Sequence, residues 1–414
     1  FVRTVTGVIR NHFPKGSAYT YVNYSPPYSG GSWTGKGVDL FMAHRDGGLE
    51  MGFTEDWGGD GAGPQHLSDT LALLRAAGRH RQPLGSYCIP QGNRAMTRLK
   101  YYTLLAGGAR TITSYAYGPW YIGIDSWGRD SLDHPSPFHV YEVLAGVQHE
   151  FGRIDKALAG THRRPSDVAI LYNRTQAIWA DGNTTCEQNG WYTHWALAHA
   201  GYDADFIAEE DIEAGDLAKY KVLYIGGRQL RGRAAAAIAT WVHAGGVLCG
   251  TAGAGTRDEY DHPMDSLVPV FAAASHGFEL RANAGRPKYE LRSLQTLDVL
   301  SSVKAHGWRR VTFDQLCIKE TLEPLRGAKI ILTNKDGRPT GTLHRFGRGI
   351  AIRLAAAPGI TYLHEAVSHQ SYDIESYLPT AFPGDLRDFI ARPAKLGNAV
   401  RIAETSAPIT EIIR

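Results

Sequence analysis

The chain has 414 residues, a net charge of +3, and 10% aromatic residues, among them 21 Tyr and 9 Trp. The length allows two or three domains. The nearly neutral charge gives no electrostatic reason to expect nucleic acid or an anionic membrane as a partner, and no apolar run is long enough to span a bilayer. The many aromatic side chains suit a carbohydrate-binding surface, although they also build large cores.

The first region, residues 1–160, alternates strands and helices. Apolar residues at helical spacing predict helices over 2–13, 38–45, 64–78 and around 96–105. Strands are predicted over 18–24, up to Glu55, over 83–89 and over 111–117. Four such βα units are half of an eight-fold barrel, in which sites lie on the loops that follow the strands.

Residues 49–63 hold the most informative stretch of this region. An apolar run ends at the acidic pair Glu55 and Asp56, and Trp57 follows directly. Carboxylates beside aromatic rings are typical of sites that bind and cleave sugars. The alternative is that Asp56 and Asp60 only cap the following helix or solvate the loop.

Other strands and the loops after them carry polar and aromatic residues that can join this pair at one mouth. Amides and hydroxyls would bind sugar hydroxyls, and Trp57 and two further aromatic rings would stack on sugar faces. The predicted ligands are Asn23, Tyr87, Gln91, Tyr115, Tyr117, Trp120 and Tyr121.

The second region follows a linker at 163–165 and has an open doubly wound pattern. Strands are predicted over 167–172, 205–207, 221–226 and 247–250, with helices over 191–201 and 234–245. A strand over 328–332, a turn over 333–337 and a hairpin over 341–354 follow. Residues 272–287 show no periodicity and are expected to form a loop, and a Pro-rich stretch from 377 precedes a last strand.

Two motifs in this region invite other functions. The glycine-rich run 250–255 lacks the GxGxxG spacing of dinucleotide-binding loops. Cys249 invites comparison with an amidotransferase nucleophile partnered by His364 and Glu365, but the glycine-flanked elbow of such a nucleophile is missing. An amidotransferase or a nucleotide-dependent enzyme is therefore the least favoured reading.

The four cysteines, at positions 88, 186, 249 and 317, are widely separated and show no metal-binding spacing. We expect buried thiols, no metal site and no cofactor. The chain opens inside a helical pattern and ends in a strand-like run, so we expect an internal piece of a longer protein. Targeting signals cannot then reveal the compartment, although a periplasmic or secreted location is slightly favoured over the cytoplasm.

Two motifs mark the second region, GGVLCGTAGAG at 245–255 and GRGIAIRLAAAPG at 347–359. With these motifs, the order of parts resembles that of glycoside hydrolase family 42 β-galactosidases. The resemblance implies an α/β chain that begins with the C-terminal half of a (β/α)8 TIM-type barrel, over 1–160. An open doubly wound domain, like a class I glutamine amidotransferase without its active site, would follow over 161–375 and serve trimerisation. Residues 376–414 would lead into a C-terminal β domain.

The resemblance also implies two catalytic Glu residues, an acid/base after barrel strand four and a nucleophile after strand seven. Counted back from the last strand, strand four would lie upstream of this chain. The nucleophile position on strand seven holds Tyr87 or Cys88 instead of Glu. Glu55 lies at the end of strand six, so the family's nucleophile role does not transfer to it.

The first hypothesis is a glycosidase that acts on a β-linked oligo- or polysaccharide, galactose-containing ones included, with Glu55 and Asp56 as catalytic carboxylates. The partner of Glu55 is expected on the other half of the barrel, because adjacent residues seldom face the same bond. The alternatives are a non-catalytic carbohydrate-binding protein on a decayed hydrolase scaffold and an oligomerisation module. The expected partners are a carbohydrate and further copies of the chain, as a trimer or dimer.

Overall fold

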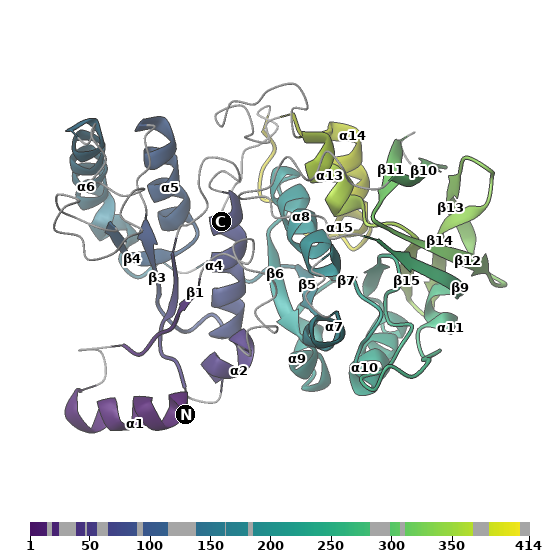
Figure 1. Cartoon of the computed structure of the whole chain (residues 1–414), viewed down its shortest axis with the longest axis horizontal. Helices are drawn as coiled ribbons and strands as arrows, with labels where there is room; N and C mark the ends of the chain where they lie inside the picture. Colours follow the sequence, from purple (N-terminus) through teal and green to yellow (C-terminus); the bar gives the residue numbers. More distant parts are fainter. Residues whose placement is uncertain are drawn as a thin grey trace.

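The structure is a computed structural model that describes most of the chain. It describes residues 1–14, 19–24, 39–45, 48–55, 65–88, 94–114, 138–161, 163–180, 185–281, 299–306, 311–366 and 381–405. The described elements form two main sheets flanked by helices, together with one separate two-stranded sheet (Figure 1). The chain therefore belongs to the α/β class.

The first sheet is parallel and its four strands follow the chain order. The strands are β1 (Asn23–Tyr24), β2 (Gly52–Glu55), β3 (Leu84–Cys88) and β4 (Ala109–Ser114). The helices are α1 (Val2–His12), α2 (Leu40–Arg45), α4 (Gln65–Ala77), α5 (Arg94–Ala106) and α6 (Phe138–Leu158). The predicted alternation is confirmed, but β1 is much shorter than the predicted strand, and α6 was not predicted.

The two faces of this sheet differ. Helices α4 and α5 cover one face. Leu74 of α4 lies so close to Gly52 that a Cβ atom added there would be 3.1 Å from it. On the same face, Ser114 Oγ lies 2.5 Å from Tyr101 Oη of α5. Side chains alternate along a strand, and residues paired in register share a face. The opposite face, which we call the site face, carries Phe53, Glu55, Gly85 and Tyr87.

The second sheet has nine strands in the order β11-β10-β13-β14-β15-β8-β7-β5-β6. Its parallel strands are β5 (Val168–Tyr172), β6 (Ala204–Ala208), β7 (Val222–Ile225), β8 (Val247–Gly250) and β15 (Gly349–Leu354). The antiparallel extension holds β14 (Pro339–Phe346), β13 (Lys329–Asn334), β10 (Val299–Ala305) and β11 (Thr312–Leu316). The sheet is therefore mixed, with the doubly wound pattern confined to its parallel half.

Helices flank this sheet on both sides (Figure 1). They are α7 (Arg174–Trp179), α8 (Thr185–His199), α9 (Glu209–Glu213), a 3-10 turn (Asp216–Lys219), α10 (Gly232–His243), α11 (Val268–Phe271), α13 (Pro358–Ala366), α14 (Gly384–Ile390) and α15 (Arg392–Leu396). The last two pack against α8 and β8. The segment expected to lead into a β domain thus begins with helices.

One prediction for this region is wrong. Part of the expected loop at 272–287 forms β9 (Ala273–Leu280), which pairs antiparallel with β12 (Ile318–Pro324). The two strands make a small sheet of their own, and most of β9 is only partly buried. A strand without a fully buried face needs no alternation of apolar and polar residues, so the sequence carried no signal for it.

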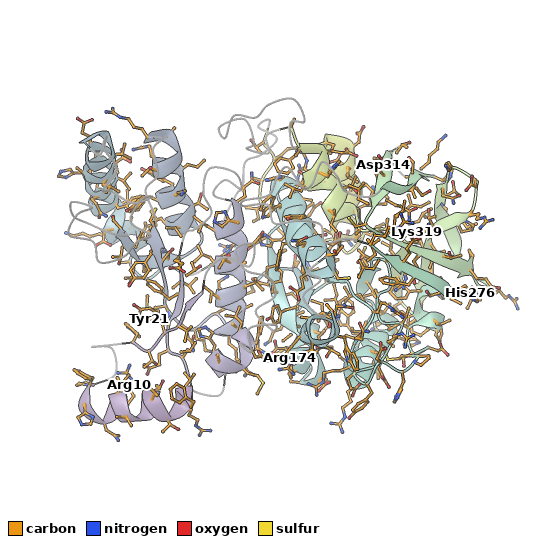
Figure 2. The ribbon with its side chains drawn as sticks, in the orientation of Figure 1. Arg10, Tyr21, Arg174, His276, Asp314 and Lys319 are labelled. Atoms are coloured by element: carbon orange, nitrogen blue, oxygen red, sulfur yellow. The ribbon has the colours of Figure 1, made fainter. Side chains whose placement is uncertain are left out.

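Helix α4 joins the two sheets. It packs on β2 of the first sheet and against β6 and α8 of the second, and one apolar core runs through both. Polar contacts cross the same junction. Buried Asp69 of α4 pairs with His194 of α8, and Arg174, which is labelled in Figure 2, forms an ion pair with Asp39. The four-stranded sheet is therefore packed on the larger one through α4.

None of the helices in the described part of the chain combines the length and the hydropathy needed to cross a bilayer. Within the same residues, no group of three or more His, Cys, Asp or Glu side chains is placed to hold a metal ion. All four cysteines are described and none forms a disulfide. Three are buried and Cys186 is half-buried.

Buried His44 leads to a prediction about pH. Burial lowers its pKa from 6.5 to about 4, although the hydrogen bond to Gln82 opposes the shift. Between these values the unfolded chain binds a proton at His44 and the folded protein does not, so stability falls as the pH falls. We expect His44 to contribute a loss of about 3 kcal/mol between pH 7 and pH 4, measured by urea denaturation. His44→Asn, whose amide can replace the ring donor, should flatten the slope; an unchanged slope would contradict the assignment.

Candidate active site

Glu55 and Tyr87 lie side by side at the carboxyl ends of two neighbouring strands. They are partners in the parallel register of β2 and β3 and both are half-buried on the site face. Adjacent strands are about 4.8 Å apart, so the two side chains leave neighbouring positions on the same face of the sheet. The carboxyl ends of parallel strands are where barrels and open α/β sheets hold their sites.

An aromatic cluster supports this pair from below. The Phe53 ring, 3% exposed, lies between Tyr21, at 4.3 Å, and Tyr87, at 4.9 Å between ring centroids. Tyr21, which precedes β1 (Figure 2), hydrogen-bonds to Tyr87. That bond and burial raise the pKa of Tyr21. Tyr21 therefore links the segment before β1 to the site face of β3.

Gly85 makes room for this cluster. A Cβ atom at position 85 would lie 2.8 Å from the Phe53 ring and would also collide with the end of Met51. We expect Gly85→Ala to displace Phe53 and to lower the free energy of unfolding by about 1–3 kcal/mol, as overpacking does. Gly146→Ala on α6, with nothing within 4 Å, is the control and should be neutral or stabilising. Equal melting temperatures for the Gly85 variant and the wild type would refute the packing argument.

The structure brings together two of the residues predicted for the site, Glu55 and Tyr87. The backbone of Asn23, on β1, pairs with that of Phe53, on β2. The side chain of Asn23 is outside what the structure describes. The remaining predicted residues, Asp56, Trp57, Gln91, Tyr115, Tyr117, Trp120 and Tyr121, lie outside the described residues. Their roles stay predictions.

Sequence reasoning missed Tyr21 and Phe53. A signal for Tyr21 was present, since Tyr19, Tyr21 and Asn23 alternate along the segment predicted as a strand. Residues two apart on a strand share a face, so Tyr21 could have been placed with Asn23. Its contact with Tyr87 depends on strand pairing, which the sequence does not reveal.

The structure distinguishes the two residues at the expected nucleophile position. Cys88 is paired in register with Ser114, on the face covered by α5, and is completely buried. Tyr87 lies on the site face beside Glu55. Of the two, Tyr87 alone shares a face with the carboxylate.

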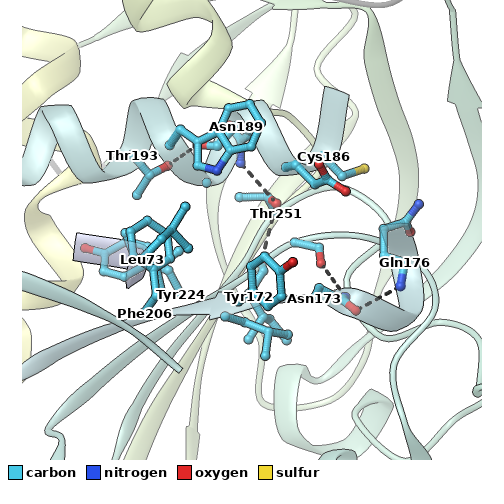
Figure 3. A pocket seen from close by; sticks show the side chains of 17 residues that line it. Leu73, Tyr172, Asn173, Gln176, Cys186, Asn189, Thr193, Phe206, Tyr224 and Thr251 are labelled. Atoms are coloured by element: carbon cyan, nitrogen blue, oxygen red, sulfur yellow. Dashed lines mark hydrogen bonds between the residues drawn. The ribbon is translucent and has the colours of Figure 1, made fainter. Parts of the chain in front are cut away.

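A hollow lies at the switch point of the large sheet, between β5 and β7 (Figure 3). Open α/β sheets often bind ligands at such a point. Its volume is about 50 Å³, whereas ligand pockets are roughly 300–1,000 Å³. Asn173, Gln176 and Thr251 on its wall hydrogen-bond within the protein. It is suited to a few water molecules and not to a sugar.

The glycine-rich run at 250–255 already binds a carboxylate of the protein itself, that of Glu320. The backbone N–H of Gly253 donates to the Glu320 carboxylate at 3.0 Å, and Arg353 pairs with the same carboxylate. A phosphate would have to displace this buried pair. Cys249 is also buried, and burial raises the pKa of its thiol to about 12, which opposes formation of the thiolate that a nucleophile needs. Neither motif makes an active site.

Comparison with known proteins found similarity only at the level of structure. No protein-family description matches the chain, and no curated protein matches its sequence. Among solved structures, the chain is similar to the cold-adapted β-galactosidase from Rahnella sp. R3, with a TM-score of 0.67, 17% identity, and 95% of this chain and 57% of that chain covered.

Two further structures are similar. Gan42B, a GH42 β-galactosidase from G. stearothermophilus, has a TM-score of 0.62 at 18% identity, covering 78% of this chain and 48% of that chain. The exo-β-1,4-mannosidase from Opitutaceae bacterium strain TAV5 has a TM-score of 0.56 at 15% identity, covering 88% and 65%. The chain spans about half the length of the two galactosidases. Over most of its length, the chain is GH42-like in fold, resembling enzymes built on a TIM barrel.

Proposed function

We propose that the chain belongs to a glycosidase that hydrolyses a β-linked oligo- or polysaccharide, galactose-containing ones included, with Glu55 as a catalytic carboxylate. The observation that carries the proposal is the pairing of Glu55 with Tyr87 at the carboxyl ends of β2 and β3. Solved structures with this fold include β-galactosidases and a mannosidase. A carboxylate beside hydroxyl-bearing aromatic rings is suited to sugar chemistry.

In this proposal the four-stranded unit is the C-terminal half of a barrel, and the partner of Glu55 lies on the other half. The nine-stranded unit is the amidotransferase-like domain through which copies of the chain associate. Its glycine-rich run, filled by Glu320, is consistent with a domain that has no active site of its own. Sedimentation of the full-length protein would distinguish a trimer or dimer from a monomer.

The experiment that tests the function is hydrolysis of a panel of aryl β-glycosides, galactosides and mannosides among them, by the full-length protein. Release of the aryl group from one sugar would support the enzyme. Isothermal titration with the matching oligosaccharides should be run in parallel. Sugar binding without hydrolysis of any panel member would contradict the proposal.

A second candidate, a carbohydrate-binding protein on a decayed hydrolase scaffold, is favoured by one observation. The strand before the last carries Tyr87 on the site face, where the family resemblance implies a catalytic Glu. Glu55 and Tyr87 could bind sugar hydroxyls without cleaving a bond. The binding and hydrolysis measurements together separate the two candidates.

A further inference from the structure

Tyr87 is the group on β3 that is best placed to act with Glu55. The two residues are register partners on one face, whereas Cys88 is buried on the other. Two carboxylates at this spacing would repel each other, and one would resist ionisation. A neutral phenol can lie beside a carboxylate without that penalty, and it can give the carboxylate its proton.

Tyr21 prepares the oxygen of Tyr87 for reaction. Tyr21 hydrogen-bonds to Tyr87; in the proposed reaction the Tyr21 hydroxyl donates to the Tyr87 oxygen and leaves the Tyr87 proton for Glu55. A donor aimed at a phenol oxygen stabilises the negative charge that develops there when the proton leaves. The Phe53 ring fixes both tyrosine rings at 4.3 and 4.9 Å, so the pair needs little reorganisation to react.

We propose that Tyr87 is the nucleophile of this site and that Glu55 is its base. The inference rests on the proposed glycosidase function and deepens it. Tyr87 Oη attacks the anomeric carbon, its proton passes to the Glu55 carboxylate, and the bond to the leaving oxygen breaks. With an activated aryl glycoside, the leaving group departs as a phenolate without an acid.

The second half of the reaction restores both residues. Water attacks the anomeric carbon of the glycosyl-tyrosine and releases its proton to solvent. The bond to Tyr87 Oη breaks, and Tyr87 recovers its proton from Glu55. Two displacements at one carbon predict retention of configuration, as in other glycosidases that form a covalent intermediate.

The test is to trap the intermediate with a 2,4-dinitrophenyl 2-deoxy-2-fluoro-β-glycoside of the sugar that the wild-type protein hydrolyses. We expect one added fluoroglycosyl mass per chain, and peptide mapping should place it on Tyr87. A label on Glu55 or on any other residue would overturn the inference, and so would inversion of the product observed by NMR.

Variants separate this inference from the function on which it rests. Tyr87→Phe keeps the ring on Phe53, so it should fold, form no adduct and hydrolyse at least ~100-fold more slowly. Tyr21→Phe should slow labelling about tenfold. Tyr102→Phe is the matched control, because the Tyr102 hydroxyl of α5 donates to Glu150 of α6. This variant should label like the wild type. Unchanged hydrolysis in Tyr87→Phe overturns the nucleophile alone, whereas no hydrolysis by the wild type overturns both proposals.

Discussion

Replacing Glu55 by glutamine is expected to lower aryl-glycoside hydrolysis by about 10²–10⁴-fold, the usual contribution of a positioned acid or base. The amide has nearly the shape of the carboxylate but cannot accept a proton. Because Glu55 is half-buried at a strand end, the change should leave the fold intact. Sugar binding should survive, since an amide still hydrogen-bonds hydroxyl groups.

The comparison is made at saturating substrate, with kcat and KM measured separately. A fall in kcat with little change in KM would place Glu55 in the chemical step. The matched control is Glu142→Gln, which changes an exposed carboxylate on α6 that pairs with Arg94 on α5. Equal kcat values for Glu55→Gln and the wild type would show that the catalytic carboxylates are other residues.

Replacing Glu320 by alanine is expected to cause the largest loss of stability. Both members of its pair with Arg353 are almost completely buried, at 4% and 3% exposed. Arg353 donates to Glu320 at 3.1 and 2.5 Å and to the backbone oxygen of Ala254. The pair connects β12, β15 and the glycine-rich run, so Glu320→Ala leaves a buried guanidinium without its carboxylate.

We expect Glu320→Ala to lower the free energy of unfolding by about 3–5 kcal/mol, the cost of breaking a buried ion pair from one side. The double variant Glu320→Leu/Arg353→Met should recover most of the loss, because it removes both charges. Asp216→Ala, which breaks an exposed pair with Lys219, should cost less than about 1 kcal/mol. Urea denaturation measures all three, and a loss for Glu320→Ala no larger than for Asp216→Ala would contradict the argument.

The order and type of most elements could be predicted from the sequence. Apolar spacing at 67, 71 and 74 predicted α4, and the continuous apolar run at 168–171 predicted β5. These signals are local, because the periodic spacing of apolar residues that marks a helix or a buried strand lies within the element itself. Helix α6 was not predicted, and the prediction of a loop over 272–287 was wrong because part of it forms β9. The irregular β9 is stabilised by its pairing with β12, a segment about 40 residues away in the chain.

The candidate site could be predicted only in part. Glu55 and Tyr87 were both identified as polar residues near strand ends, on different strands. Their meeting depends on the register of β2 and β3, which pairs them directly. Register is decided by packing across the whole sheet, and a shift of one residue would have placed Cys88 beside Glu55 instead.

The sequence by itself determined the alternation of strands and helices and the acidic residue at the end of β2, since both depend on near neighbours in the chain. Only the tertiary structure decided that Tyr87 shares a face with Glu55, that Tyr21 hydrogen-bonds to Tyr87, and that Glu320 fills the glycine-rich run. These contacts join residues 32, 66 and 67 positions apart (87 minus 55, 87 minus 21 and 320 minus 253). Such contacts arise from strand register and close packing, which no local pattern of residues encodes.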